Sequence, residues 1–165
     1  MLQQSKVVRC GSREPFIDAA GQQTFVLTAE DTQGRLEWIE GMVNFAGGPI
    51  YHIHHMADEA VTVLEGELKF KIDDELVDLG PGDCLFVPRG VPHTFTNVHR
   101  DRPAKLVGVY APAGLQTFLR LWDELSASGT LDEAARAELA ARYGMEAVGS
   151  PLAVELGLSG PLHKA

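Results

Sequence analysis

The sequence is poor in cysteine and in basic residues. Its 165 residues include two cysteines, Cys10 and Cys84, too few for a disulfide scaffold, so we expect a reducing, cytoplasmic setting. Lys and Arg number 14 against 23 Asp and Glu, which leaves a formal net charge of −9. Nucleic acids and anionic membrane surfaces attract clustered basic residues, so we expect neither as a partner.

Long hydrophobic segments are also missing. The apolar runs are much shorter than the roughly 20 residues of a membrane-spanning helix, so no membrane span is expected. Residues 1–20 contain no basic segment followed by an apolar core, which argues against a secretion signal. What is present is the length of one domain, with 45% hydrophobic residues, enough for one ordinary core.

Up to about residue 112 the sequence has the pattern of a mainly β protein. Two pairs of strand-like segments predict hairpins: 23–29 with 35–45, and 60–64 with 67–73. Gly66 supplies the positive φ that the second turn would need. Further strand-like segments are 76–79, 84–88, 93–98 and 104–111. Many short strands separated by turn signals predict an antiparallel sandwich or barrel.

After Pro112 the hydrophobic period becomes helical. One stripe at helical spacing comprises Leu115, Phe118, Leu119, Trp122 and Leu125. The segment 130–133 resembles a capping box and opens a second helix that Gly144 can close. An exposed stripe of this size would favour aggregation, so we expect residues 113–165 to pack on the β domain and to contribute to a homodimer. The last twenty residues have no clear period, and we expect them to lie across a surface.

The most informative residues are three histidines and one glutamate in two short segments. His52 and His54 are two apart on a predicted strand, so they point to the same face. Glu59 begins the next strand after a short bend, close enough to aim back at that pair. His93 begins another strand, three residues after Gly90. We therefore treat these four side chains as one candidate site.

The donor set of this site predicts a metal. Three neutral imidazoles and one carboxylate suit Fe, Mn, Co, Ni, Cu or Zn better than Mg or Ca. We expect one divalent transition-metal ion per chain on His52, His54, Glu59 and His93, with two positions of an octahedral ion left open. The alternative is a buried polar cluster without a metal, which must bury a carboxylate beside three imidazoles without a compensating cation.

Both segments match the cupin pattern in spacing. The first reads His52-x-His54, four residues, Glu59, six residues, Gly66. The second reads Gly82, five residues, Pro88-x-Gly90, two residues, His93, three residues, Asn97. A small departure is the four-residue gap between Gly47 and His52, where five is usual. Over about residues 35–112 the sequence resembles a small single-domain cupin, and most closely the quercetin dioxygenase-like members.

The resemblance implies a jelly-roll barrel (a double-stranded β-helix) with a metal in its mouth, and often a homodimer. We place this barrel in residues 1–112 and a short helical extension, packed on it in the same domain, in residues 113–165. Our leading hypothesis is a metal-dependent oxidoreductase of the dioxygenase type acting on a small organic substrate. Glu59 would then be a ligand and a general base. The alternatives are a non-catalytic module that binds a small molecule or metal, and a redox-neutral cupin enzyme such as an isomerase, because the fold alone does not choose the reaction.

Several other residues admit two interpretations. Trp38, Glu40 and Met42 share one face of a strand, and both orientations remain open. If that face is interior, Glu40 is a second carboxylate near the pocket. Cys84 is expected to be a buried, inert thiol. His55 is expected to lie behind the ligands or on the surface and not to be a ligand, and surface positions are expected for His99 and His163.

Overall fold

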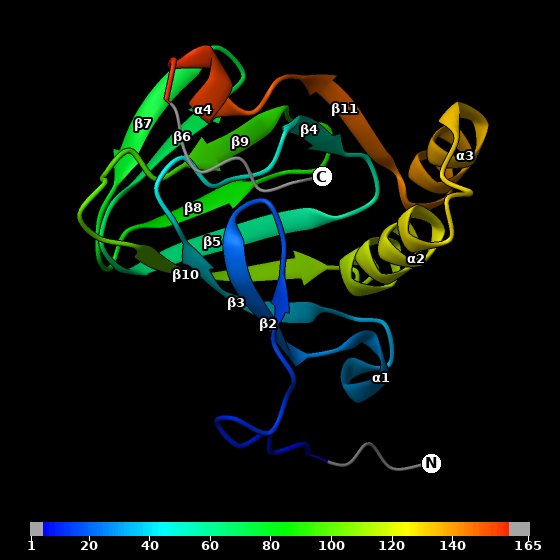
Figure 1. Cartoon of the computed structure of the whole chain (residues 1–165). Coiled ribbons are helices and arrows are strands. Elements are labelled where there is room, and N and C mark those ends of the chain that lie inside the picture. Colours follow the sequence, from blue (N-terminus) through cyan, green and yellow to red (C-terminus); the bar gives the residue numbers. More distant parts are fainter. Residues whose placement is uncertain (1–4, 159–165) are drawn as a thin grey trace.

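Two antiparallel sheets face each other in the computed structural model, which describes residues 5–158 (Figure 1). The six-stranded sheet has the order β1-β2-β3-β10-β5-β8, and the five-stranded sheet has the order β11-β4-β9-β6-β7. The bounds of the strands are β1 Phe16–Ile17, β2 Gly21–Leu27, β3 Glu37–Val43, β4 Tyr51–His54, β5 Asp58–Glu65, β6 Leu68–Ile72, β7 Glu75–Leu79, β8 Cys84–Val87, β9 His93–Thr96, β10 Ala104–Ala111 and β11 Met145–Gly149. The predicted mainly β jelly-roll fold is confirmed.

Alternation along the strands builds the core. On β6, Leu68 and Phe70 are buried while the intervening Lys69 stays partly exposed, as the sequence pattern predicts. The central hydrophobic cluster consists of Ala20, Val43, Val61, Val63, Leu68, Phe70, Ala104 and Leu106. This cluster lies between the two sheets, so it supports strands of both at once.

The first predicted hairpin is present, with a helical turn in its connection. β2 and β3 pair antiparallel, and the one-turn helix α1 (Ala29–Thr32) lies between them. Thr28 and Asp31 form a capping box, in which each side chain hydrogen-bonds to the backbone N–H of the other. The connection between these two strands is therefore a capped helical turn.

The second predicted hairpin is wrong. Gly66 does adopt a positive φ of 74°, but β5 pairs with β10 and β8, whereas β6 pairs with β7 and β9. The chain therefore turns a corner from one sheet to the other at Gly66. A Cβ there would meet the Cα of Ala104 at 2.9 Å, so the corner packs tightly against β10.

The C-terminal region forms helices and then returns to the barrel. Helix α2 (Leu115–Ala127) and helix α3 (Glu133–Tyr143) follow β10, and Gly144 ends α3 in the left-handed conformation, as predicted. The cap of α3 is Asp132, whose side chain accepts from the N–H of Ala135. None of the helices within residues 5–158 is long and apolar enough to span a membrane.

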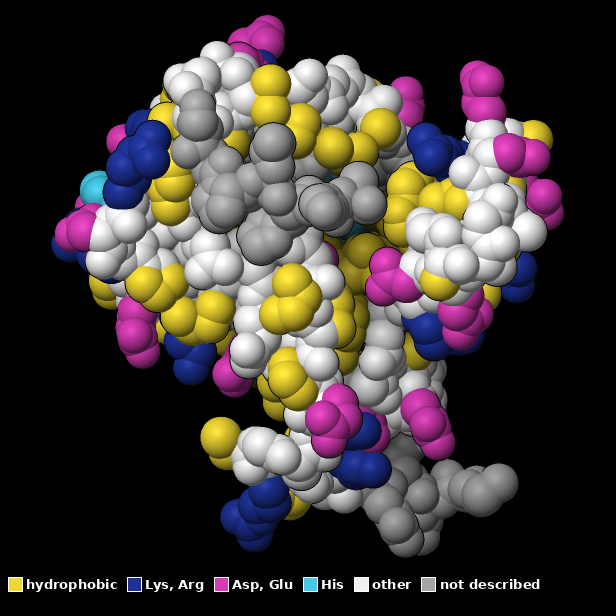
Figure 2. All heavy atoms as spheres, viewed as in Figure 1, with side chains coloured by type: hydrophobic (Ala, Val, Ile, Leu, Met, Phe, Trp, Pro, Cys, Tyr) yellow, Lys and Arg dark blue, Asp and Glu magenta, His cyan; other side chains and the backbone are white. Residues whose placement is uncertain are grey.

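One strand in this region was not predicted. β11 pairs with β4 and so extends the five-stranded sheet beside the strand that carries His52 and His54. The short helix α4 (Leu152–Glu155) follows, and its Leu152 is fully buried. Figure 1 shows α2 and α3 beyond one end of the sheets, and Figure 2 shows hydrophobic side chains gathered between this helical pair and the barrel.

Candidate metal centre

The four candidate ligands converge inside the barrel from three strands. β4 carries His52 and His54, β5 carries Glu59, and β9 carries His93 directly opposite His52. One donor atom from each residue lies within 4.8 Å of the others, and all four side chains are buried. Residues two apart on a strand share a face, so both histidines of β4 point inward. The carboxylate of Glu59 comes from β5, in the other sheet. The structure therefore brings together the four residues that the spacing selected.

Backbone carbonyls orient two of the imidazoles. The Nδ1 atom of His52 lies 2.8 Å from the carbonyl oxygen of Ile50, and that of His93 lies 2.9 Å from the carbonyl oxygen of Val91. A carbonyl only accepts, so in both rings Nδ1 carries the proton and donates it. This tautomer turns the Nε2 lone pair toward the centre, as in metal sites whose histidines are held by a second hydrogen bond.

The central contacts fit a cation. The Nε2 atoms of His52 and His54 lie 3.0 Å apart, and the Oε2 atom of Glu59 lies 3.0 Å from His93 Nε2 and 3.3 Å from His54 Nε2. A proton shared between two of these atoms can form only one of the three hydrogen bonds. A divalent ion at the centre would satisfy all four donor atoms together, and three imidazoles with one carboxylate are a donor set that transition metals accept.

The protonation of the ion-free site follows from burial and from these contacts. Burial, followed by the nearby His93 and His54, lowers the pKa of His52 to about 3. Burial alone would raise the pKa of Glu59, but hydrogen bonds from His54 and His93 lower it below its usual range. Burial alone would lower the pKa of His93, but the Glu59 carboxylate raises it. Below the pKa of His93, the protonated ring and the Glu59 carboxylate therefore form an ion pair, and its proton competes with a metal for the Nε2 atom.

Tyr110 is a site residue that the sequence reasoning missed. It lies opposite Glu59 across the β10–β5 pair, and its hydroxyl donates to Glu59 Oε1 at 2.9 Å. Its ring centroid lies 5.5 Å from that of His54. Burial, and then the Glu59 carboxylate, raise the pKa of Tyr110 well above its usual value, so the hydroxyl keeps its proton. The sequence places Tyr110 in a predicted strand, but nothing in the sequence indicates that this strand pairs with the one that carries Glu59.

A second carboxylate does face the interior, but it is Glu37. Glu37 lies opposite Tyr110 on β3 and is fully buried. Its Oε2 atom accepts from the N–H of Gln116 at 3.2 Å, and its Oε1 atom has no hydrogen-bond partner among the described residues. Glu40 lies on the opposite face of the same strand, 3.7 Å from Lys105. The interior alternative for Trp38, Glu40 and Met42 is therefore wrong, since Trp38 is 38% exposed.

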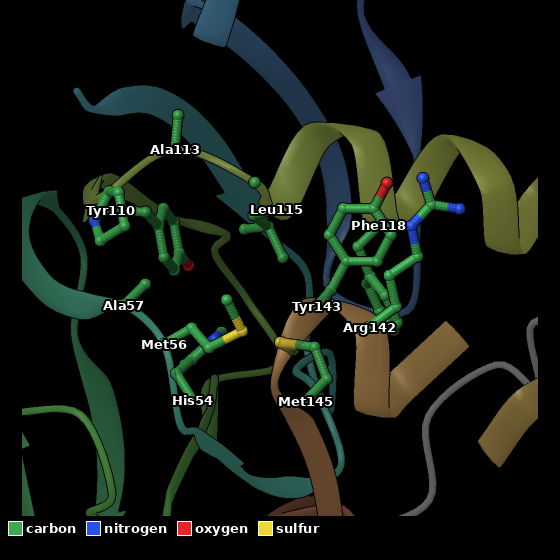
Figure 3. A pocket seen from close by; sticks show the side chains of 12 residues that line it. His54, Met56, Ala57, Tyr110, Ala113, Leu115, Phe118, Arg142, Tyr143 and Met145 are labelled. Atoms are coloured by element: carbon green, nitrogen blue, oxygen red, sulfur yellow. The ribbon is translucent and has the colours of Figure 1, made fainter. Parts of the chain in front are cut away.

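A cavity of about 220 Å³ adjoins the site, between the barrel mouth and the C-terminal helices. In Figure 3, His54, Met56, Ala57 and Tyr110 lie on the barrel side of this cavity, while Phe118, Arg142 and Tyr143 lie on the helical side. His54 is the candidate ligand that lines it. The cavity therefore reaches the candidate metal centre through His54 and the adjacent Tyr110.

The remaining histidines and the second cysteine lie away from the centre. His55 is exposed and bonds to Glu146 at 2.6 Å, and His99 lies 3.5 Å from Glu67. His163 lies outside the described residues. Cys84 is exposed, so the expected burial of its thiol is wrong, because it points outward from β8.

Comparisons with known proteins agree with this architecture. Residues 41–110 match the family described as Cupin domain. KdgF from Halomonas sp. is similar at a TM-score of 0.59 and 14% identity, covering 68% of this chain and 99% of that one. The polyketide cyclase RemF from Streptomyces resistomycificus is similar at a TM-score of 0.57 and 23% identity, covering 66% of this chain and 80% of that one.

The similarity to another solved structure extends over more of the chain. A Streptomyces PAC13 variant with uridine has a TM-score of 0.60 at 14% identity, covering 92% of this chain and 97% of that one. At these identities the likeness concerns the fold. No curated protein matches the sequence.

Proposed function

This chain belongs to the cupin superfamily, and we propose that it is a metal-dependent oxidoreductase of the dioxygenase type acting on a small organic substrate. One observation carries the proposal: the donor atoms of His52, His54, Glu59 and His93 converge within 4.8 Å, and His54 also lines the adjacent cavity. A metal held there would supply a Lewis acid or a redox partner to a bound molecule.

The residues around the centre would prepare it for this chemistry. Tyr110 holds Oε1 of Glu59, which leaves Oε2 facing the histidines and able to accept a proton. We propose this carboxylate as the general base. Apolar side chains of the cavity, among them Met56, Leu115 and Phe118, exclude water from the reacting end. They also suit dioxygen, which is itself apolar.

A redox-neutral reaction is the second candidate, and a specific contact favours it. The hydroxyl of Tyr110, which lines the cavity, donates to the ionised carboxylate of Glu59 at 2.9 Å. Tyr110 can donate a hydrogen bond to a substrate oxygen and Glu59 can take up a proton, and neither step needs an oxidant. The structural relative RemF is described as a polyketide cyclase.

Oxygen dependence separates the two candidates. Full-length protein, loaded in turn with Fe, Mn, Ni, Co, Cu or Zn, would be screened against polyphenols and diketones in air and under strict anaerobiosis. For a dioxygenase we expect oxygen uptake with the turnover, and label from ¹⁸O₂ in the product. Equal turnover without oxygen would replace the first candidate by the second. His55→Ala is the control, because His55 is exposed and bonds to Glu146.

We further propose a homodimer formed through the outer face of the six-stranded sheet. An apolar row crosses this face in register, because Trp38 lies opposite Val109, Val109 opposite Ala60, and Ala60 opposite Phe86. Phe86 is 62% exposed in the single chain. We expect sedimentation velocity to show a dimer that Phe86→Glu dissociates. A monomeric wild-type protein at micromolar concentration would contradict the proposal.

A reducing, cytoplasmic setting is also a proposal. It is supported by Cys10 and Cys84, which are both free and exposed thiols. Such thiols persist unmodified where the surroundings keep them reduced.

A further inference from the structure

Arg142 is the permanently charged side chain in the wall of the cavity. The other lining residues are apolar or uncharged apart from the titratable His54 and two tyrosines. Arg142 has no ion-pair partner among the described residues, and its guanidinium lies 5.6 Å from the centroid of the Tyr143 ring. The side chain of Arg142 is exposed, so its planar donors are accessible, and an arginine can bind a carboxylate through two hydrogen bonds.

The cavity is therefore polarised from one side to the other. His54 and Tyr110 lie on the barrel side, next to the candidate metal centre, and Arg142 lies on the helical side (Figure 3). Apolar groups such as Met56, Leu115 and Phe118 complete the wall. A molecule that fills the cavity would thus have the reactive groups at one end and, at the other, the solvent-exposed side chain of Arg142.

The nearby carboxylates do not neutralise this cation. Glu59 is engaged by His93, His54 and Tyr110 inside the barrel. Glu37 accepts from the N–H of Gln116 in the first turn of α2. Glu146, close in sequence to Arg142, is bonded to His55. These three carboxylates have their own partners, and no ion pair joins Arg142 to Glu138, one turn earlier on α3, among the described residues. The positive charge of Arg142 therefore stays available to a ligand.

The volume of the cavity limits the size of a ligand that can bind in it. Its volume of about 220 Å³ is below the roughly 300–1,000 Å³ of pockets that hold drug-sized ligands. A single substituted ring fits this volume better than a fused polycyclic molecule, and the rings of Phe118 and Tyr143 offer surfaces for it.

We propose that the cavity takes a small monoanionic carboxylate with an apolar, ring-sized body. The carboxylate binds Arg142, and the opposite end of the molecule lies against His54 and Tyr110. This inference names the substrate class of the site in the proposed function and rests on that function for its chemistry. The binding step, however, depends on Arg142 and is measured independently of turnover.

Two probes of equal shape test the charge requirement. 3-Phenylpropionate and 3-phenylpropanamide differ in the carboxylate that the amide replaces, and their affinities would be measured by calorimetry on the full chain, both metal-free and loaded with Zn²⁺. We expect the carboxylate to bind about ten-fold or more tightly than the amide, as a charge-assisted hydrogen bond predicts. Arg142→Gln should remove this preference.

Arg136→Gln is the matched control. Arg136 is on the same helix, its guanidinium lies 6.0 Å from the Trp122 ring centroid, and it does not line the cavity. The control should keep the full preference for the carboxylate. Arg142 is in the last turn of α3, where a cation also favours the helix, so melting temperatures of both variants would show whether folding is affected.

The possible results separate two failures. Equal binding of both probes, or a preference that survives in Arg142→Gln, overturns the inference. A preference that survives there in the Zn²⁺ form alone would assign the carboxylate to the metal and also overturns it. If the chain binds no metal but the metal-free form shows the Arg142-dependent preference, the proposed function fails and this inference stands.

Discussion

The hydroxyl of Tyr110 donates to Oε1 of Glu59 at 2.9 Å, across the strand pair β10–β5. This contact joins a residue that no spacing rule selected to the one carboxylate among the candidate ligands. It leaves Oε2 of Glu59 beside His93 and His54. Tyr110 therefore orients the carboxylate for the centre of the barrel.

Tyr110→Phe should weaken metal binding while leaving the fold intact. Loss of the hydroxyl frees Oε1 of Glu59 to rotate, and loss of such an outer hydrogen bond typically costs about 10- to 100-fold in metal affinity. Competition with a chromophoric chelator would measure the change. Tyr143→Phe is the control, since Tyr143 lines the cavity without bonding to the ligands. Equal affinities of wild type and Tyr110→Phe would contradict the orienting role.

The metal content of the purified chain tests the ligand set directly. We expect about one transition-metal ion per chain in protein prepared without an affinity tag. Elemental analysis by inductively coupled plasma mass spectrometry would measure this metal content. The double variant His52→Ala/His93→Ala should lose it, because half of the donor atoms are removed. His55→Ala and His99→Ala should keep it, since both residues lie outside the cluster. Full retention in the double variant would reject the site.

Metal affinity should rise with pH. The Glu59 carboxylate raises the pKa of His93 against the effect of burial, so the ion-free site binds a proton that a metal must displace. Below the pKa of His93 this competition weakens binding, and above it the competition disappears. Zn²⁺ titrations in buffers of different ionisation enthalpy would count the released protons. An affinity that stays constant between about pH 5.5 and 8 would contradict the ion pair.

Glu37→Ala should destabilise the chain by about 2–3 kcal/mol, because it leaves a cavity and an unpaired N–H at Gln116. Glu37→Gln keeps an acceptor of the same shape, and we expect a change below about 1 kcal/mol. Urea unfolding would measure both. Glu40→Ala, on the exposed face of the same strand, should change stability by less than about 0.5 kcal/mol. Equal effects at residues 37 and 40 would show that burial is not the cause.

The segment after β11 should contribute to stability through Leu152. This side chain is fully buried, and truncating a buried leucine typically costs about 2–5 kcal/mol. Leu156→Ala, at a residue that is 37% exposed, should cost less than about 1 kcal/mol. Thermal and urea unfolding would compare the two variants. A Leu152→Ala protein as stable as wild type would show that this segment does not help hold the sheet.

Much of the site was predictable because its spacing is local. Residues two apart on a strand share a face whatever the strand pairs with, so the joint orientation of His52 and His54 follows from the sequence alone. The same holds for the stripe on α2 and for Gly144, which ends α3 as a left-handed residue. Gly66 likewise needed a positive φ, although the sequence could not show that it turns a corner between sheets.

The rest depended on long-range pairing. The neighbours of β10 are β3 and β5, and this arrangement alone puts Glu37, Tyr110 and Glu59 in one row. A shift of one residue would have turned Glu40 inward in place of Glu37. The return of β11 to β4 likewise carries the end of α3, with Arg142, to the cavity. The sequence by itself determined which side chains share a strand face. Only the tertiary structure decided which strands became neighbours, because strand pairing joins residues far apart in the chain and leaves little trace in local periodicity.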